Sequence, residues 1–345
     1  MYGPAAADHG KYSTSGVPDA RGDRVSSANL MRSSTFSRTI STVQRAGLHL
    51  RKIQREDGAV VGEVIWCPML AAQWVIFHHA VQRPLEAQQV KRLIRYFEQQ
   101  QLPDGSFGLH DESHGYLFTT VLSYVALRLL GLTSSDPAVT RTAMWLQDKR
   151  VIEIPTWGKM WLALVGLYDW RGVPPTPPEL WLLPESAPIH PQRYYCHTRL
   201  IYLGFSYLYG VRFQGPEDTI IHELREELFP QGYEDINWRQ AQSALFEPDI
   251  HTPPTRWLRA SYGLLGVSEH ITPTVLRKRA LKECLRRIRF EVDATGGQGI
   301  SPVNGMLCAL AMHHAGDARA ENAWRELSYW VWEDDISGAR VAGAM

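Results

Sequence analysis

The sequence predicts an all-α protein, and three observations support that fold class. Apolar residues recur at helical spacing, for example at Phe118, Val121, Leu122 and Val125. Few segments alternate apolar and polar residues in the way that a half-buried strand requires. A short turn element also occurs twice, at a distance that suits a pair of helices. We therefore expect helical hairpins that stack side by side.

The apolar spacing places several helices along the chain. Residues 90–97 predict one helix, and residues 276–290 predict another with basic residues on its outer face. The helix that begins near Phe118 should end at Gly131, because glycine readily leaves the helical conformation. The next helix should begin at Asp136, since aspartate caps a helix and the proline after it fits the first turn.

Two segments are expected to be irregular. Residues 1–34 are rich in Gly, Ser, Asp and Ala and predict a disordered tail, which leaves residues 35–345 as the folded domain. Residues 173–184 contain a run of prolines. Because proline cannot continue a helix, this segment is expected to cross the surface as a stiff extended strap.

The turn element consists of glutamine, then Asp-Gly at the fourth and fifth places, then an apolar residue. Its two copies begin 47 residues apart. Glycine allows positive φ in the tight turn, glutamine can bond exposed backbone of a neighbouring helix, and the apolar residue folds back onto the helices. Hairpins that repeat in this way can close into an α/α barrel. The residues that we assign to this structural repeat are Gln54, Gly58, Gln101, Asp104, Gly105 and Phe107.

Composition argues against several functions. The formal net charge is zero, from 36 basic and 36 acidic residues, which gives no electrostatic case for nucleic acid. The four cysteines are widely spaced without a CxxC pair, so we expect no zinc framework and no other cofactor, and nothing demands an oxidising compartment. The 12 Trp and 14 Tyr suit a ring-packed core or a pocket for an apolar or cationic ligand.

The sequence also bears on membranes and targeting. It contains no run of eighteen apolar residues, so no spanning helix is expected. The beginning lacks the apolar core of a secretory signal, so we do not expect secretion. Residues 24–54 contain Arg, Lys, Ser and Thr but no acid, which faintly resembles a transit peptide. We favour a structural role for the end of that stretch, because the first copy of the turn element begins there, at Gln54.

Longer stretches around the second turn resemble the oxidosqualene and squalene-hopene cyclases, the terpene cyclase/mutase family. The turn itself is similar to the QW motif of this family, Gln-x-x-x-Gly-x-Trp. Residues 101–131 (QLPDGSFGLHDESHGYLFTTVLSYVALRLLG) resemble QxxDGGWGLHxEGxSTMFGTxLxYVALRLLG. Residues 155–183 resemble PSWGKFWLAxLxxYxWxGxxxxPPExWLLP, residues 195–213 resemble WCHCRxVYLPMSYLYGxRF, and residues 301–304 are similar to GPVNK. The likeness extends from about residue 40 to residue 335 and is closer to eukaryotic oxidosqualene cyclases than to bacterial hopene cyclases.

The sequence also departs from the family pattern. The turns carry Val60 and Phe107 in place of Trp, and Thr198 stands where the family often has the second Cys of WCHC. Residues 62–69 do not reproduce the family's GDYGGPMF. The likeness fades after Asp335, before the GxNGSQxWD strand and the C-terminal half with its acidic motif, DCTAE or DxDD. We therefore expect the N-terminal half of a two-barrel fold, with a partial second barrel at its ends and no catalytic general acid.

The resemblance implies an isomerase that cyclises 2,3-oxidosqualene or squalene in triterpenoid or sterol biosynthesis. Such an enzyme needs a protonated carboxylic acid, a dry pocket that folds the polyene, and aromatic faces beside developing carbocations. By resemblance, His197, Tyr202 and Trp161 line the substrate cavity and Thr198 lies where substrate enters. A packing role remains open for His197, Tyr202 and Trp161. His197 and Tyr202 lie about 140° apart on a helix, so both reach one cavity only if it is broad or the helix ends near it.

Three other groups of residues are expected to serve structure. The acids of residues 333–335 align with the family's AEDG, which indicates a solvated turn rather than a substitute general acid. His110 and His114 have the spacing of a metal site, but Gly108 and Gly115 bracket them as a turn, so no metal is expected. The tryptophans that we expect to be packing residues are Trp157, Trp170 and Trp181.

Three functions from different classes are open. In the first, the chain is a working or once-working cyclase component, inactive by itself, whose other half comes from a separate polypeptide or was lost from the gene sequence. In the second, it is a catalytically dead relic or a pseudoenzyme that binds an isoprenoid or sterol. In the third, it is another α/α-barrel protein such as a prenyltransferase β-subunit. That third reading needs a zinc set, and Cys196 and His197 should point about 100° apart on a helix, so they cannot chelate together.

The resemblance also implies a membrane surface as a partner, because family members sit in one leaflet by an apolar plateau. By resemblance the location is the cytosolic face of the endoplasmic reticulum membrane or of a lipid droplet. A core helix would explain the candidate patch as well as a plateau does. The patch consists of Trp257, Leu258, Tyr262, Leu264, Leu265 and Val267.

Overall fold

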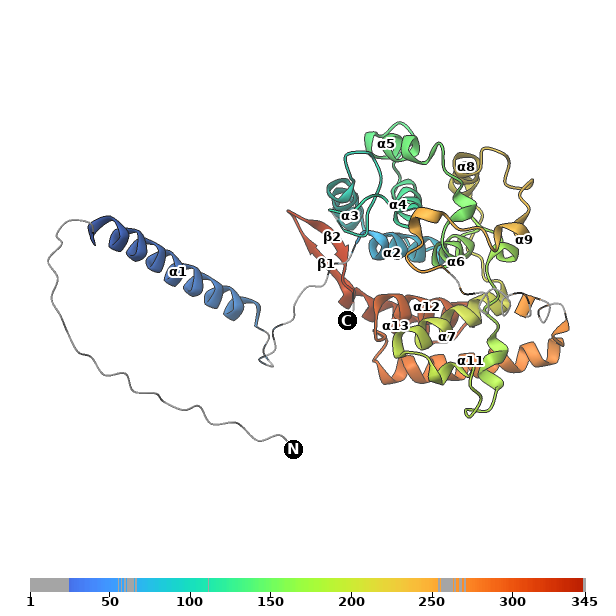
Figure 1. Cartoon of the computed structure of the whole chain (residues 1–345). Helices are drawn as coiled ribbons and strands as arrows, with labels where there is room; N and C mark the ends of the chain where they lie inside the picture. Colours follow the sequence, from blue (N-terminus) through green and yellow to red (C-terminus); the bar gives the residue numbers. More distant parts are fainter. Residues whose placement is uncertain are drawn as a thin grey trace. The chain divides into compact units, whose positions relative to one another are not determined.

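The computed structural model describes most of the chain from residue 25 onward (Figure 1). The described residues are 25–54, 56, 58, 60, 65, 67–110, 112–253, 255, 263, 265, 266, 269 and 271–343, with side chains from residue 36. The chain divides into two compact units, residues 1–63 and residues 64–345.

The first unit contains one long helix and the first turn element. Helix α1 extends over Val25–Ile53, so part of the stretch assigned above to a disordered tail is helical, and the remainder of that tail lies outside the described residues. After the helix, the Gln54 side chain donates from Nε2 to the carbonyl of Gly58 at 2.8 Å. Gly58 has φ +84°, the left-handed conformation for which the turn needs glycine.

The second unit is built of helices, which confirms the predicted all-α class of helical hairpins. Short 3₁₀ turns connect several of them, and no described helix is long and apolar enough to cross a bilayer. The helices are α2 Met69–Ala80, α3 Ala87–Gln100, α4 Leu117–Leu129, α5 Pro137–Leu146, α6 Thr156–Leu164, α7 Cys196–Val211, α8 Thr219–Leu228, α9 Trp238–Ala241, α11 Thr274–Ala294, α12 Pro302–His314 and α13 Arg319–Glu326.

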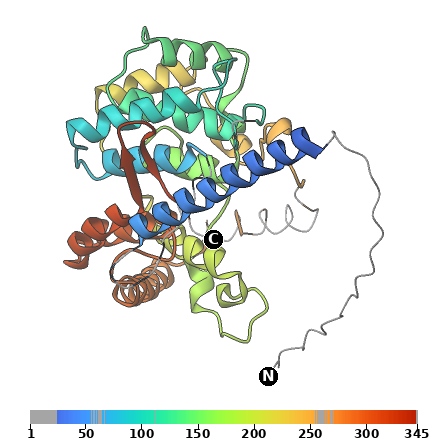
Figure 2. The same cartoon turned by 90° about the vertical axis from the view of Figure 1, so that its left-hand side faces the viewer.

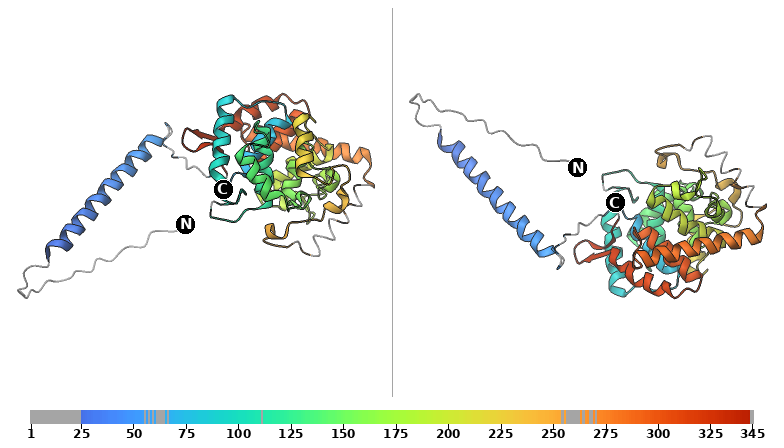
Figure 3. Two further views of the ribbon diagram at one scale, coloured as in Figure 1. Left: turned by 90° about the horizontal axis from the view of Figure 1, so that it is seen from above. Right: turned by 90° about the horizontal axis from the view of Figure 1, so that it is seen from below.

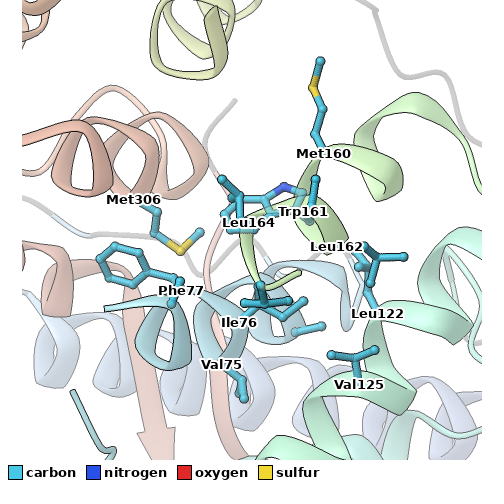
Figure 4. Close-up of a cluster of buried hydrophobic side chains, with 14 of the residues drawn as sticks. Val75, Ile76, Phe77, Leu122, Val125, Met160, Trp161, Leu162, Leu164 and Met306 are labelled. Carbon is cyan, nitrogen blue, oxygen red and sulfur yellow. The ribbon is translucent and has the colours of Figure 1, made fainter. Parts of the chain in front are cut away.

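Helix α2 forms the centre of this unit, between α4 and α6 on one side and α12 on the other (Figure 1). It is apolar on all its faces, and a helix of that kind is stable only when it is enclosed. Figure 4 shows how side chains of α4, α6 and α12 meet it around Ile76 and Phe77, which are 0% exposed. The same packing fixes the ends of α2 and α6 that form the site described below.

One β hairpin follows the helices, and the sequence analysis did not predict it. Strands β1 (Val331–Asp334) and β2 (Gly338–Val341) pair antiparallel. The hairpin packs on α3, more than 230 residues earlier in the chain (Figures 2 and 3). Arg92 of α3 holds it through Glu333 at 2.8 Å and Asp335 at 2.7 Å.

The second turn element shows the same hydrogen bond as the first. Gln101 Nε2 lies 3.1 Å from the carbonyl oxygen of Gly105 and 2.9 Å from that of Ala138 in α5, so it joins the turn to the neighbouring helix. Gly105 has φ +89°. Phe107 is 0% exposed and packs edge-on against Phe97, with 6.2 Å between ring centroids. Phenylalanine therefore fills the position at which the family motif carries tryptophan.

Two local predictions need correction. The proline-rich segment does not cross the surface, because residues 173–178 are buried and Pro178–Leu182 forms a 3₁₀ turn. Proline has no backbone N–H, so an extended run of prolines can be buried with few unsatisfied donors. Asp136 precedes α5 as predicted, but its carboxylate accepts from the backbone N–H of Thr133 at 2.7 Å rather than from the first turn of the helix.

A cavity lined by rings between α2, α6 and α7

The first cavity lies where α2, α6, α7 and α12 approach one another. Its volume is about 410 Å³, and aromatic and aliphatic side chains form most of its wall. A cavity of this kind presents apolar surface and ring faces to an occupant. The lining residues are Met69, Leu70, Gln73, Phe118, Trp157, Trp161, Tyr195, His197, Thr198, Ile201, Ser301, Pro302, Val303 and Gly343.

Trp161 anchors this wall from α6. It is 0% exposed (Figure 4), and its ring meets Phe205 edge-on with 6.0 Å between centroids. Trp157, one turn earlier, is 41% exposed and lines the cavity, so the expectation of a pure packing role for it is wrong. Trp170 and Trp181 are buried, as that expectation requires, and their indole N–H groups donate within the core.

His197 lines the same cavity from the first turn of α7. Its ring stacks on Tyr195, with 5.3 Å between centroids and 18° between the planes. Its Nδ1 atom lies 3.3 Å from Cys196 Sγ, so the expectation that these two side chains diverge is wrong. Neighbouring side chains at the open end of a helix can lean toward each other, because no preceding turn confines them. The described residues offer no group of three His, Cys, Asp or Glu side chains that could hold a metal.

Tyr202 lies in a different, second cavity of about 740 Å³. Its hydroxyl donates to the carbonyl of Pro177 at 2.7 Å, and burial raises its pKa well above the ordinary value. Thr198 and Trp157 line both cavities. The four residues expected to share one cavity thus line two neighbouring ones, because the 140° between His197 and Tyr202 turns them to different sides of α7.

Asp249 supplies a carboxylate to the wall of the second cavity, and the sequence analysis did not find it. Its two oxygens accept from the backbone N–H groups of Leu117 at 3.0 Å and Phe118 at 2.9 Å. It therefore caps the beginning of α4 from more than 130 residues away. Burial raises the pKa of Asp249, and the two N–H groups oppose that rise. Both oxygens are used for structure.

Lys159 was also missed, and it shapes the loop that leads to Asp249. The side chain is 0% exposed and donates from Nζ to the carbonyls of Ala241 at 2.7 Å, Gln242 at 3.2 Å and Ala244 at 2.7 Å. Burial lowers the pKa of Lys159 to about 8. The ammonium group thus binds carbonyl groups at the C-terminal end of α9, where the partial negative charge of a helix end favours a cation.

The acids of residues 333–335 are paired with arginines. Asp334 lies 2.8 Å from Arg340, and the other two acids bind Arg92 as described above. Backbone N–H groups of the hairpin turn lower the pKa of Asp334 to about 2. A carboxyl that is ionised at neutral pH cannot donate a proton to an alkene or epoxide. The structure differs from the expected solvated turn only in placing the first two of these acids on a strand.

Gln73 is the third residue that the sequence analysis missed. It projects from α2 into the wall of the first cavity and is 2% exposed. Its side-chain oxygen has no hydrogen-bond partner among the residues that the structure describes. The available signal was one amide within the otherwise apolar run from Met69 to Phe77.

The comparisons with known proteins identify the class to which the fold and the cavities belong. A sequence model of the squalene-hopene cyclase N-terminal domain matches residues 43–335. Human lanosterol synthase is 35% identical over 275 residues, which cover 79% of this chain and 37% of that protein. Cycloartenol synthase of Dictyostelium discoideum is 36% identical over 295 residues, 84% of this chain and 42% of its own length. Alpha-onocerin synthase of Lycopodium clavatum is 34% identical over 315 residues, 86% of this chain and 41% of its own length.

These matches define a triterpene cyclase type of protein. The chain belongs to the oxidosqualene/squalene-hopene cyclase family and corresponds to its N-terminal domain. It spans less than half the length of the relatives named here. The family assignment made from residues 101–131, 155–183 and 195–213 is thereby confirmed.

Proposed function

We propose that this chain forms one wall of a triterpene cyclase cavity that binds 2,3-oxidosqualene or squalene. The observation that carries the proposal is the first cavity, whose described lining combines Phe118, Trp157, Trp161 and Tyr195 and contains no carboxylate. Ring faces attract a carbocation without offering it a nucleophile. The names of the relatives, synthases of lanosterol, cycloartenol and alpha-onocerin, support the same reaction class.

The residues of this chain take positioning and charge-stabilising roles in the proposed reaction. The ring faces of Trp161 and Trp157 stabilise positive charge that develops on the folded polyene. The imidazole of His197, in the first turn of α7, contacts the polyene bound in the first cavity. Thr198 and Trp157 separate the two cavities, so a ligand that passes from the second to the first must pass these side chains. Replacement of the family's thiol by the Thr198 hydroxyl alters this passage rather than the chemistry.

The initiating proton must come from elsewhere. In the second cavity both oxygens of Asp249 accept backbone N–H groups, so this acid is committed to helix capping. We therefore propose that these residues by themselves form no cyclic product. A separate polypeptide as the source of the acid has no support in the relatives, because each carries the matched segment within one longer chain.

Binding without cyclisation is the second candidate function. A pseudoenzyme that holds an isoprenoid or sterol needs the apolar, ring-lined cavity and no general acid, and the described lining of the first cavity meets both conditions. This alternative differs from the first in its catalytic outcome and not in its ligand class.

A membrane surface remains the proposed site of substrate uptake, at the endoplasmic reticulum or a lipid droplet. Except for Leu265, the candidate apolar patch named above lies outside the described residues. Helix α1 offers separate support, because Phe36, Ile40 and Val43 fall on one helical face and Arg38 and Arg45 fall on the opposite one. A basic amphipathic helix of this kind is suited to an anionic lipid surface.

The test combines binding and turnover. The purified chain is incubated with squalene and with 2,3-oxidosqualene, products are separated by gas chromatography, and ligand binding is measured at equilibrium. We expect binding of at least one of the two and no cyclic product. Trp161→Ala should weaken binding about tenfold through loss of ring contact, whereas Tyr329→Ala, at an exposed ring outside the described lining of both cavities, should not. A tetracyclic or pentacyclic product would refute the inactive state, and a chain that binds neither polyene would refute the cavity assignment.

A further inference from the structure

Two buried polar side chains line the first cavity without a hydrogen-bond partner among the described residues. The Gln73 side-chain oxygen is one, on a residue that is 2% exposed. The indole Nε1 of Trp161 is the other, on a residue that is 0% exposed. Buried polar atoms in native proteins are nearly always hydrogen-bonded, so two such atoms in one cavity wall require an explanation.

Packing alone does not explain the amide. Gln73 belongs to α2, the apolar helix at the centre of the unit, and the residues on either side of it, Ala72 and Trp74, are buried in the core. Leucine or methionine would fill a similar volume without an unsatisfied amide. An unsatisfied amide at this position carries a free-energy cost that a hydrogen bond from a ligand can remove.

The chemistry of the two groups specifies the ligand. The indole N–H of Trp161 only donates, whereas the Gln73 amide donates and accepts. A hydroxyl group can accept a hydrogen bond from the indole N–H and can donate one to the Gln73 oxygen, so an alcohol has the hydrogen-bonding capacity that each of these atoms needs. An ether, epoxide or ketone can only accept, and a hydrocarbon does neither. The rings of Phe118 and Trp157 in the same wall suit an apolar skeleton around that oxygen.

We propose that the first cavity favours an isoprenoid alcohol and that Gln73 and Trp161 bind its hydroxyl group. The proposal rests on the proposed function, because it places the isoprenoid in the same cavity. His197 adds a third polar atom to this wall, since its Nε2 is buried and also without a partner among the described residues. The cavity is thus polar at defined points within an apolar surface.

The test compares three probes that share one isoprenoid skeleton: geranylgeraniol, its methyl ether and the corresponding hydrocarbon without oxygen. Binding to the full chain is measured by titration calorimetry. We expect the alcohol to bind about tenfold more tightly than the hydrocarbon, with the ether between them. Gln73→Leu should weaken binding of the alcohol about tenfold and leave binding of the hydrocarbon unchanged or stronger.

Two further variants make the result specific. Trp161→Phe keeps a ring in the wall and removes the N–H donor, so it should cause the same selective loss for the alcohol. Gln88→Leu changes an exposed glutamine of α3 and should change neither affinity. If Gln73→Leu does not fold, as judged by circular dichroism, Trp161→Phe carries the test.

The outcomes separate the two proposals. Equal affinity of the unaltered chain for all three probes would overturn the hydroxyl assignment and leave the isoprenoid cavity standing. A loss of affinity for all three probes alike in Gln73→Leu and Trp161→Phe would do the same. Failure of every probe to bind would overturn both proposals.

Discussion

Acidification between pH 6.5 and pH 4 should destabilise the protein through His78. This histidine of α2 is 9% exposed, and its Nδ1 lies 2.9 Å from the carbonyl oxygen of Arg83, so a neutral imidazole donates there. Burial lowers the pKa of His78 to about 4; the hydrogen bond to the Arg83 carbonyl opposes that fall, and the charge of Arg83 adds a smaller lowering. The rings of Trp74 and Trp324 enclose it at 4.5 and 4.9 Å between centroids.

The sign and size of the effect follow from these values. Below pH 6.5 the unfolded chain takes up a proton at His78 and the folded chain does not, so the free energy of unfolding falls as the pH falls toward 4. The difference between 6.5 and about 4 corresponds to about 3 kcal/mol. Carboxylates that gain stability from arginines, such as Glu283 with a pKa of about 2, lose it at lower pH.

The assay is urea unfolding at a series of pH values from 7 to 4. His78→Phe keeps a ring in the aromatic cluster and removes the titrating group, so its stability should fall less over this range, by about 3 kcal/mol at pH 4. His313→Gln, at an exposed histidine of α12, should retain the dependence of the unaltered chain. Equal slopes for the unaltered chain and His78→Phe would show that the reasoning is wrong.

Two further predictions concern the fold around the site. Gly105→Ala should cost about 3 kcal/mol, because φ is +89° and the added Cβ would lie 2.4 Å from the carbonyl oxygen of Arg141. Gly131→Ala, at φ +95° with open space, should cost only about 1 kcal/mol, and similar urea midpoints for the two would contradict the steric argument. Lys159→Met should cost about 2 kcal/mol and make the loop after α9 more sensitive to limited proteolysis, because three carbonyls lose the hydrogen bond from the ammonium group. Lys282→Met, at an exposed lysine, is the control, and an unchanged cleavage rate in Lys159→Met would exclude a holding role for its ammonium group.

The sequence predicted what depends on nearby residues. Apolar spacing located α4. Gly131 follows the end of that helix with φ +95°, a conformation that glycine adopts readily because it has no Cβ. The proline after Asp136 marked the first turn of α5. The family motifs located Trp161 and His197, which the structure brings to one cavity. Each of these features is encoded within a few residues or within a contiguous motif.

The remaining features depend on distant contacts. Asp249 caps α4 from the other side of a fold that the local sequence does not reveal. Lys159 has its three acceptors more than 80 residues away, so its position in an apolar helix gave no sign of its partners. Tyr202 lines the second cavity and not the cavity of His197, because helical spacing gives the angle between two side chains and not the position of the wall between them.

The enclosed position of α2 has a consequence for how the protein is made. The apolar surface of α2 is fully covered only when α12 packs on it, and α12 begins at Pro302. At about 5–20 residues per second, a ribosome reaches α12 roughly 10–50 s after it has finished α2. During that interval the nascent chain exposes part of the apolar surface of α2. Slow elongation or a shortage of chaperones will therefore favour aggregation.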